Sequence, residues 1–336
     1  MNPDELIRLA HGSGGLLTQQ LFQNIFLKHF RNPEIAKMDD GALLETPCGN
    51  LIVSTDSFVI DPIFFPGGDI GHLSVCGTVN DIAVSGGIPQ YITTAFILEE
   101  GFPLKDLDTV VASIARESRY ANVKVVAGDT KVVEKGKGDK IFINTTGIGS
   151  MHPKANLGTD QIRAGDHIIV SGTIAEHGIA VLSKREGLRF SSTVVSDAQC
   201  LHKPILDLLD RFNGIRFMRD PTRGGIATVL AEIATASKHT LSINEQDIPI
   251  REDVAGACEM LGIDPLYLAN EGKFVLICGA DDSPEIIHFL QEYYPTMQPT
   301  VIGSVRSGSA TALLSTPYGG MRILEMLPDE ILPRIC

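Results

Sequence analysis

Short apolar segments alternate with segments of helical periodicity along this chain, and this alternation constrains the fold more than any other feature. Apolar runs of a few residues predict strands, whereas apolar positions spaced three and four residues apart predict helices. In the first half we expect strands at 51–54, 91–98, 123–127 and 141–148, and helices near 15–31, 69–86 and 104–119. Glycines stand at many of the junctions and make up 33 of the 336 residues, about 10% against a typical 7%. The pattern predicts a mixed α/β (α+β) fold.

A polar, turn-rich stretch over 150–165 divides the chain. After it the alternation resumes, with strands in HIIVSGT, FVLICGA, TVIGSV and ATALLS and helices at 176–186, 200–212, 223–237 and near 284–293. We therefore expect two domains, 1–155 and 156–326, in line with about 150 residues per domain. The remaining residues, 327–336, contain two prolines and no periodicity, which predicts an extended, mobile arm.

The charge balance is acidic, with 28 Lys and Arg against 41 Asp and Glu and a formal net charge of −13. Such a chain gains nothing from the counterion release that drives nucleic-acid binding, and anionic membrane surfaces repel it. No apolar run approaches the roughly 20 residues that span a bilayer, and no secretory signal is visible at the start. We therefore expect a cytoplasmic protein that binds neither nucleic acid nor membrane.

Acidic residues stand at expected strand ends and helix starts of the first half. They are Asp40 in MDDGA, Asp56 in STDSF, Asp81 in VNDIAVSGG, and Asp129 in VAGDTKV, where Lys131 follows two residues later. Mg²⁺ takes oxygen ligands from the protein and usually from substrate phosphates as well. Any one of these residues could instead cap a helix or form a turn. Four of them in one half, with a lysine beside the last, favour a magnesium–nucleotide site.

Two glycine-rich segments, HGSGG at 11–15 and DPTRGG at 220–225, each precede a predicted helix whose free N–H groups could bind phosphate. Arg223 adds a guanidinium that can donate two hydrogen bonds to a phosphate. Neither segment matches the patterns GxxxxGK[ST] or GxGxxG, and without the carboxylates simple helix caps would explain both. The histidines show no HxxxH or similar spacing, so we expect no transition-metal site.

Six cysteines are spread along the chain without a CxxC pair, so structural zinc and thioredoxin-like chemistry lack support. Five stand in apparently folded sequence, where a cysteine usually acts as a small buried hydrophobe. The sixth, Cys336, is the last residue, whereas a CaaX box would place its cysteine fourth from the end. From Leu327 the arm reaches about 33 Å when extended. We expect it to present the Cys336 thiol to a partner and then to withdraw it into a cleft.

Taken in order, the motifs MDDGA, STDSF, VNDIAVSGGIP, VAGDTKV, DPTRGG and NEGK resemble those of the ATP-binding superfamily that includes aminoimidazole ribonucleotide synthetase and selenophosphate synthetase. The resemblance implies two α/β domains and a homodimer in which the N-terminal domains form an intersubunit β-barrel. It also implies that ATP and Mg²⁺ bind to the N-terminal domain. The candidate metal and nucleotide ligands that it carries over are Asp40, Asp56, Asp81 and Asp129, with Asn80, Lys131 and Arg223 toward the phosphates.

Within that superfamily, the ending PRIC resembles the carbamoyl dehydratases of [NiFe]-hydrogenase maturation. The resemblance implies that HypF places a carbamoyl group on Cys336 and that ATP-dependent dehydration turns it into a thiocyanate. The cyanide would then pass to iron on a HypC–HypD complex. Forming the C≡N bond removes two protons from nitrogen, so a base is needed. Glu271 in NEGK is the first candidate and Lys131 the second, although Glu271 could instead be a turn residue paired with Lys273.

Two other kinds of function stay open. An amidine-forming synthetase or a thiamine phosphate kinase of the same superfamily would not need a terminal thiol. A non-catalytic carrier would use Cys336 as a shuttle but would not need the acidic motifs that this chain retains. Selenophosphate synthesis is disfavoured, because HGSGG contains no cysteine and the first cysteine is Cys48.

Overall fold

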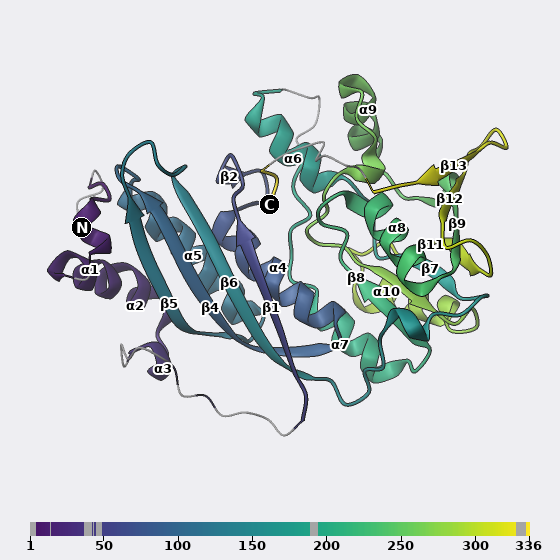
Figure 1. The fold of residues 1–336 in the computed structure, drawn as a ribbon, viewed down its shortest axis with the longest axis horizontal. Coiled ribbons are helices and arrows are strands. Elements are labelled where there is room, and N and C mark those ends of the chain that lie inside the picture. The colour runs from purple at the N-terminus through teal and green to yellow at the C-terminus, as the bar shows by residue number, and fades with distance from the viewer. Residues whose placement is uncertain are drawn as a thin grey trace.

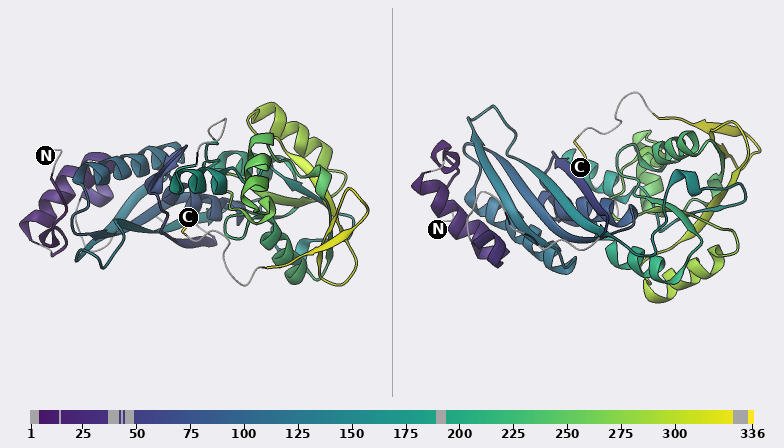
Figure 2. Two further views of the ribbon diagram at one scale, coloured as in Figure 1. Left: turned by 90° about the horizontal axis from the view of Figure 1, so that it is seen from above. Right: turned by 60° about the horizontal axis from the view of Figure 1, so that its bottom comes forward.

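The structure is a computed structural model (Figure 1). It describes residues 5–13, 15–36, 42, 44, 49–188, 194–326 and 334–336. Two β-sheets, each packed against helices, follow one another along the long axis of the molecule. Figure 2 shows the N-terminal helices at one end of that axis and the C-terminal sheet toward the other. The predicted two-domain α/β fold is therefore confirmed, while the boundary at 155/156 stays a prediction.

The first sheet has the strand order β1-β6-β4-β5. Its strands are β1 (Leu51–Phe58), β4 (Gly87–Glu99), β5 (Lys124–Val133) and β6 (Ile141–Met151). Helices α4 (Ile70–Val84) and α5 (Leu104–Tyr120) cover one face of this sheet, as Figure 1 shows. Thirteen of the fifteen residues of α4 are buried, because this helix lies between the first sheet and the C-terminal half. Its Asp69 N-cap accepts hydrogen bonds from the N–H groups of Gly71 and His72.

No described helix covers the other face of the first sheet in this single chain. Alternate side chains of a strand point to opposite faces, and along β1 the even-numbered residues face α4. The apolar side chains of Leu51, Val53 and Ile97 are therefore left 47%, 62% and 45% exposed. Exposed apolar side chains that gather on one sheet face mark a surface that can bind a partner.

The helix predicted near 15–31 consists of three consecutive helical segments. They are α1 (Leu16–Leu21), a π-helical turn η2 (Phe22–Phe26) and α2 (Leu27–Phe30). The 3₁₀ turn η1 (Leu9–Gly12) precedes them and α3 (Pro33–Ala36) follows, while β2 (Phe64–Phe65) and β3 (Gly68–Asp69) form a short hairpin before α4.

The second sheet has seven strands in the order β13-β12-β9-β11-β7-β10-β8. The strands are β7 (His167–Val170), β8 (Ile215–Arg219), β9 (Thr240–Asn244), β10 (Val275–Cys278), β11 (Thr300–Arg306), β12 (Ala312–Ser315) and β13 (Met321–Leu324). The helices of this half are α6 (Glu176–Arg185), α7 (His202–Arg211), α8 (Gly225–Ser237), α9 (Glu252–Leu261) and α10 (Ser283–Tyr293). Both faces of the sheet are buried, since Val275 and Ile277 of β10 pack in one core and Leu276 and Cys278 in another. The 3₁₀ turns η3 (Thr159–Gln161), η4 (Glu245–Asp247) and η5 (Pro265–Tyr267) complete this half.

Four elements of this half have no counterpart in the sequence prediction: β8, β9, β13 and α9. Strands β8 (IRFMR) and β9 (TLSIN) are only five residues long and contain charged or polar residues. In so short a segment the alternation of apolar and polar residues that identifies a strand cannot be recognised. None of the described helices combines the length and the apolar character that a membrane span requires.

Residues 334–336 return to the first half of the chain, and Figure 1 places the C-terminus between the two sheets near β2. The backbone N–H of Val59 donates to the backbone oxygen of Cys336 (3.0 Å), and that of Asp61 donates to Arg334 (3.2 Å). Ile335 is 6% exposed and packs in the core of the first half. The last three residues of the predicted arm are therefore docked beside the end of β1, and the mobility of the arm stays a prediction. Residues 327–333 lie outside the described part of the chain.

Candidate active site

An acidic cleft lies where the docked end of the chain meets both sheets. Its acidic side chains come from β1 (Asp56), the last turn of α4 (Asp81), the loop after β8 (Asp220) and the segment before β10 (Glu271). Cys336 lines the same cleft. The free volume beside the docked residues is about 40 Å³, which has room for a water molecule but not for a nucleotide. Residues 280 positions apart in the sequence are thus brought to one site.

Hydroxyl groups orient the two carboxylates of the first half. Thr78 Oγ1 donates to Asp56 (3.0 Å), and Ser54 Oγ donates to Asp81 (2.6 Å). Two positional assumptions made from the sequence are wrong here. Asp81 stands near the end of a helix, and Asp129 lies within β5, which continues through polar residues to Val133.

Burial and mutual repulsion raise the pKa values of the acids in this cleft. The pKa of Asp81 rises to about 6, mainly by desolvation and then by the charge of Asp56. The pKa of Asp220 rises to about 8, mainly by desolvation and then by the charge of Asp81. Burial, followed by the charge of Asp220, holds the pKa of Glu271 well above its usual value. A cation bound among these side chains would remove this repulsion.

Glu271 is 2% exposed, and its Oε1 accepts no hydrogen bond from any described residue. The carboxylate of Asp197 holds the backbone of this segment by accepting from the N–H groups of Glu271 (3.2 Å) and Gly272 (3.1 Å). Lys273 Nζ also pairs with Asp197 (3.2 Å). The alternative in which Glu271 is a turn residue paired with Lys273 is therefore wrong. An unpartnered buried carboxylate oxygen fits a group that binds a cation or accepts a proton.

Two other predicted residues also lie at or beside the acidic cleft. Arg223 lines it from the loop before α8, where Gly224 and Gly225 adopt positive φ angles of 70° and 60°. A Cβ atom on Gly225 would lie 2.5 Å from the backbone oxygen of Leu266, so this DPTRGG segment requires glycine there. Asn80 is 1% exposed, and its amide donates to Gln199 O (3.0 Å) and accepts from Leu201 N–H (2.7 Å). Asn80 thereby joins α4 to the segment 194–201.

Asp129 and Lys131 line a different cavity. Their side chains are 62% and 66% exposed and form an ion pair of 3.1 Å. This cavity measures about 680 Å³ and is also lined by Gly12 and Gly15 of the HGSGG segment and by Thr94. Within this chain, the predicted ligand set is thus divided between two cavities. Asp40 lies outside the described residues.

Sequence reasoning did not include three residues that shape the acidic cleft. Asp220 is the first residue of the DPTRGG motif, so the motif pointed to this residue as a possible site residue. Asp197 and His177 lie in no recognisable sequence pattern. His177 is fully buried, and its Nε2 donates to Ile335 O (2.8 Å). Its Nδ1 is therefore the acceptor for Ser196 Oγ (2.7 Å). Desolvation lowers the pKa of His177, so the ring is neutral and keeps this arrangement at neutral pH.

Two family models match the two halves of the chain and define its class. Residues 38–151 match the N-terminal domain of AIR synthase related proteins, and residues 163–314 match the C-terminal domain. Thiamine-monophosphate kinase from Stenotrophomonas maltophilia has the same fold, with a TM-score of 0.66 at 17% identity.

Closer relatives narrow the class. The carbamoyl dehydratase HypE of Azotobacter vinelandii is 46% identical over 98% of this chain and 97% of its own length. A crystal structure of HypE in complex with ATP superposes with a TM-score of 0.94 at 44% identity, covering 98% of this chain and 99% of that one. A HypE–HypF complex matches with a TM-score of 0.80 at 44% identity, over 93% of this chain and 100% of that one. The chain belongs to the HypE family of carbamoyl dehydratases.

Proposed function

We propose that this chain uses ATP to dehydrate a carbamoyl group carried on Cys336 to a thiocyanate, which supplies the cyanide ligand for the iron of [NiFe]-hydrogenase. The observation that carries the proposal is that Cys336 lines the same cleft as Glu271, Asp56, Asp81 and Asp220. A small-molecule kinase or synthetase has no use for a docked cysteine at this place.

The docked end of the chain supports a substrate that is carried in and out of the cleft. Its contacts are backbone hydrogen bonds to Val59 and Asp61, the His177 bond to Ile335, and a bond of 2.5 Å from Arg185 to the oxygen of Arg334. These bonds fix the backbone on both sides of Ile335 and depend little on what the sulfur carries. The same anchoring can therefore serve the thiol, the carboxamide and the thiocyanate.

A magnesium ion fits the acidic cleft, because its carboxylates are crowded oxygen donors with raised pKa values. Asp56, Asp81 and Asp220 would hold the ion, and the ion would supply positive charge to the phosphates of ATP. Arg223 would donate to the same phosphates. Asp40, Asn80, Asp129 and Lys131 stay proposed nucleotide or metal contacts. Binding of ATP by this chain is supported by its 44% identity to the HypE that was crystallised with ATP.

The chemistry assigns a separate task to Glu271. The carboxamide oxygen attacks the γ-phosphorus of ATP and becomes the oxygen of a phosphorylated imidate, with release of ADP. Loss of that oxygen as phosphate and of both nitrogen protons leaves S–C≡N. Glu271 Oε1 is the proposed proton acceptor, since it is buried and accepts no hydrogen bond from any described residue. A cation bound in the cleft would offset the repulsion that raises its pKa and so favour the ionised, proton-accepting form. Lys131, an exposed residue of the second cavity, is the weaker candidate.

A homodimer is part of the proposal. The open face of the first sheet, with Leu51, Val53 and Ile97 exposed, supports the expected pairing of two N-terminal sheets into a barrel. In such a dimer a second copy would complete the nucleotide site that one chain divides between two cavities. HypF is the proposed carbamoyl donor, supported by the HypE–HypF complex, and HypC–HypD the proposed cyanide acceptor in the cytoplasm.

The test separates this function from a small-molecule enzyme. A chain lacking residues 334–336 is compared with the full chain for ATP hydrolysis with and without carbamoylation by HypF. We expect the truncated chain to lose the carbamoyl-dependent hydrolysis entirely. A truncated chain that keeps full turnover would instead identify a kinase or synthetase for a free substrate.

A further inference from the structure

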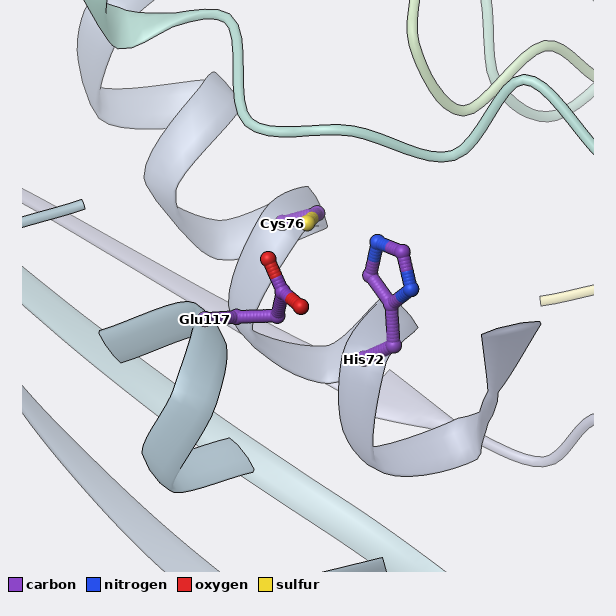
Figure 3. A group of neighbouring side chains, drawn as sticks. All are labelled: His72, Cys76 and Glu117. Carbon is purple, nitrogen blue, oxygen red and sulfur yellow. The ribbon is translucent and has the colours of Figure 1, made fainter. Parts of the chain in front are cut away.

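A second cluster of chemically reactive side chains lies on the helical side of the first sheet. His72 and Cys76 stand four residues apart on α4, so both point to the same side of that helix. Glu117 of α5 faces them, as Figure 3 shows, and the candidate ligand atoms of these three residues all lie within 4.8 Å of one another. Cys200 lies beside this group of three, with its Sγ 3.2 Å from Cys76 Sγ.

We propose that His72, Cys76, Glu117 and Cys200 bind one Zn²⁺ ion in a closed, four-coordinate site. One imidazole nitrogen, two sulfurs and one carboxylate oxygen form a donor set of the kind that zinc takes in proteins. The expectation that no transition metal binds was based on HxxxH spacing, but the sequence HLSVC has the equivalent HxxxC spacing.

The distances are close to those of a loaded site. Bonds of about 2.0–2.3 Å in a tetrahedron put ligand atoms about 3.3–3.8 Å apart. The ligand atoms of His72, Cys76 and Glu117 lie within 4.8 Å of one another, so each pair has to close by at most about 1.5 Å. The sulfurs of Cys76 and Cys200 have to move apart by about half an ångström. Side-chain rotations can supply movements of this size.

The charges also suit a zinc ion. Burial lowers the pKa of His72, which leaves a neutral imidazole, and a hydrogen bond with the Ala198 backbone fixes the ring. Burial and the neighbouring Cys200 raise the pKa of Cys76 well above its usual value, so without metal it is a thiol. Two thiolates, one carboxylate and Zn²⁺ leave one negative charge. Arg116 Nε, 2.7 Å from Glu117 Oε1, balances it.

Two plainer roles explain less of the arrangement. Packing alone accounts for two buried cysteines, but not for an imidazole and a carboxylate directed at the same point. A disulfide would need the sulfurs at about 2.05 Å, and it would leave His72 and Glu117 without a role.

The site would join α4, α5 and the segment 194–201, and through that segment it would help to position Glu271. Cys200 belongs to the segment 194–201. Asp197 of this segment holds the backbone of Glu271, and Asn80 of α4 holds Gln199 and Leu201. A metal ion between α4, α5 and Cys200 would fix this segment against the helix that carries Asp81. The ion is thus a positioning element and takes no part in the chemistry, so the proposal does not depend on the proposed function.

Metal content gives a direct test. The reduced full chain is loaded with Zn²⁺ or Co²⁺, desalted, and analysed for metal per chain, with cobalt also read by its thiolate charge-transfer absorption. We expect one equivalent in the unaltered chain and in C336A, D81N and the buried-cysteine control C278A. We expect loss of the metal and of the absorption in H72A and C200A.

A second measurement uses the unaltered chain and is therefore independent of whether variants fold. Bound zinc should slow alkylation of Cys76 and Cys200 at least tenfold relative to the chelated protein, while Cys278 is unaffected. The proposal is overturned if the reduced chain retains no stoichiometric metal, if C200A binds as much as the unaltered chain, or if chelation leaves both alkylation rates unchanged.

Discussion

The imidazole Nε2 of His177 donates a hydrogen bond of 2.8 Å to the carbonyl oxygen of Ile335, the residue before the cysteine that lines the acidic cleft. This bond joins α6 of the second half to the end of the chain, which at the same time pairs with Val59 of the first half. In this docked position residues 334–336 form one wall of the cleft. Under the proposed function, release of the same residues opens it.

Loss of this anchor should affect the two reactions of Cys336 differently. In H177A a buried hydrogen bond worth about 1–3 kcal/mol is lost, so we expect ATP-dependent dehydration to slow about tenfold or more. Carbamoylation by HypF, which we propose to act on the released arm, should stay the same or become faster. The exposed-histidine variant H288A serves as the control, and single-turnover assays of the two steps make the comparison. Equal slowing of both steps would argue against a docking role for His177.

Removing the proposed base should block dehydration without blocking loading. In E271Q the shape is kept but the proton acceptor is lost, so we expect the dehydration rate to fall by a factor of about 10²–10⁴. The carbamoylated protein should then accumulate in the presence of ATP, which intact-mass measurements detect. The exposed glutamate variant E285Q should behave like the unaltered chain. Normal turnover in E271Q would transfer the role of base to Lys131 or to water.

The raised pKa values predict how stability depends on pH. Asp81 and Asp220, with pKa values of about 6 and about 8 in the folded chain against an ordinary 3.8, bind more protons folded than unfolded between pH 4 and 8. The free energy of unfolding of the magnesium-free protein should therefore fall as the pH rises through this range. D220N removes the larger contribution and should be more stable at pH 8, on the order of a few kcal/mol, with a flatter profile.

Urea unfolding from pH 5 to pH 8, with EDTA and then with Mg²⁺, measures this effect. Magnesium should raise the stability at pH 8 of the unaltered chain more than that of D220N. A profile that is the same in the two proteins would show that Asp220 does not titrate in this range.

The open sheet face should be a dimer interface. Val53 is 62% exposed in the single chain. A glutamate introduced at this position would be buried at the centre of the expected barrel, where an unpaired charge is unfavourable. We therefore expect V53E to be a monomer in sedimentation experiments, with loss of ATP binding if the nucleotide site needs both copies. Y318E, at a fully exposed tyrosine in the turn between β12 and β13, should remain a dimer. A dimeric V53E would place the interface elsewhere.

Local patterns were sufficient to predict much of the fold but only part of the site. The periodicity of 104–119 predicts α5 to within one residue, because its apolar side faces the sheet and its polar side faces solvent. Strand β5 extends beyond the predicted 123–127, since its polar residues Asp129 and Lys131 are still paired with β4. No local pattern reveals that Asp220 lies beside Asp81 or that Cys336 pairs with Val59. Those contacts depend on how the two halves pack.

The central claim is that Cys336 carries the group that is dehydrated, and the mass of the peptide containing Cys336 tests it most directly. Protein carbamoylated by HypF is mixed with Mg–ATP, quenched, digested and measured, with C278A as a cysteine control. We predict that the Cys336 peptide first gains one carbamoyl group and then loses the mass of one water, to give the thiocyanate. A carbamoyl group found on another residue, or a carbamoylated Cys336 that is unchanged by Mg–ATP, would contradict the account.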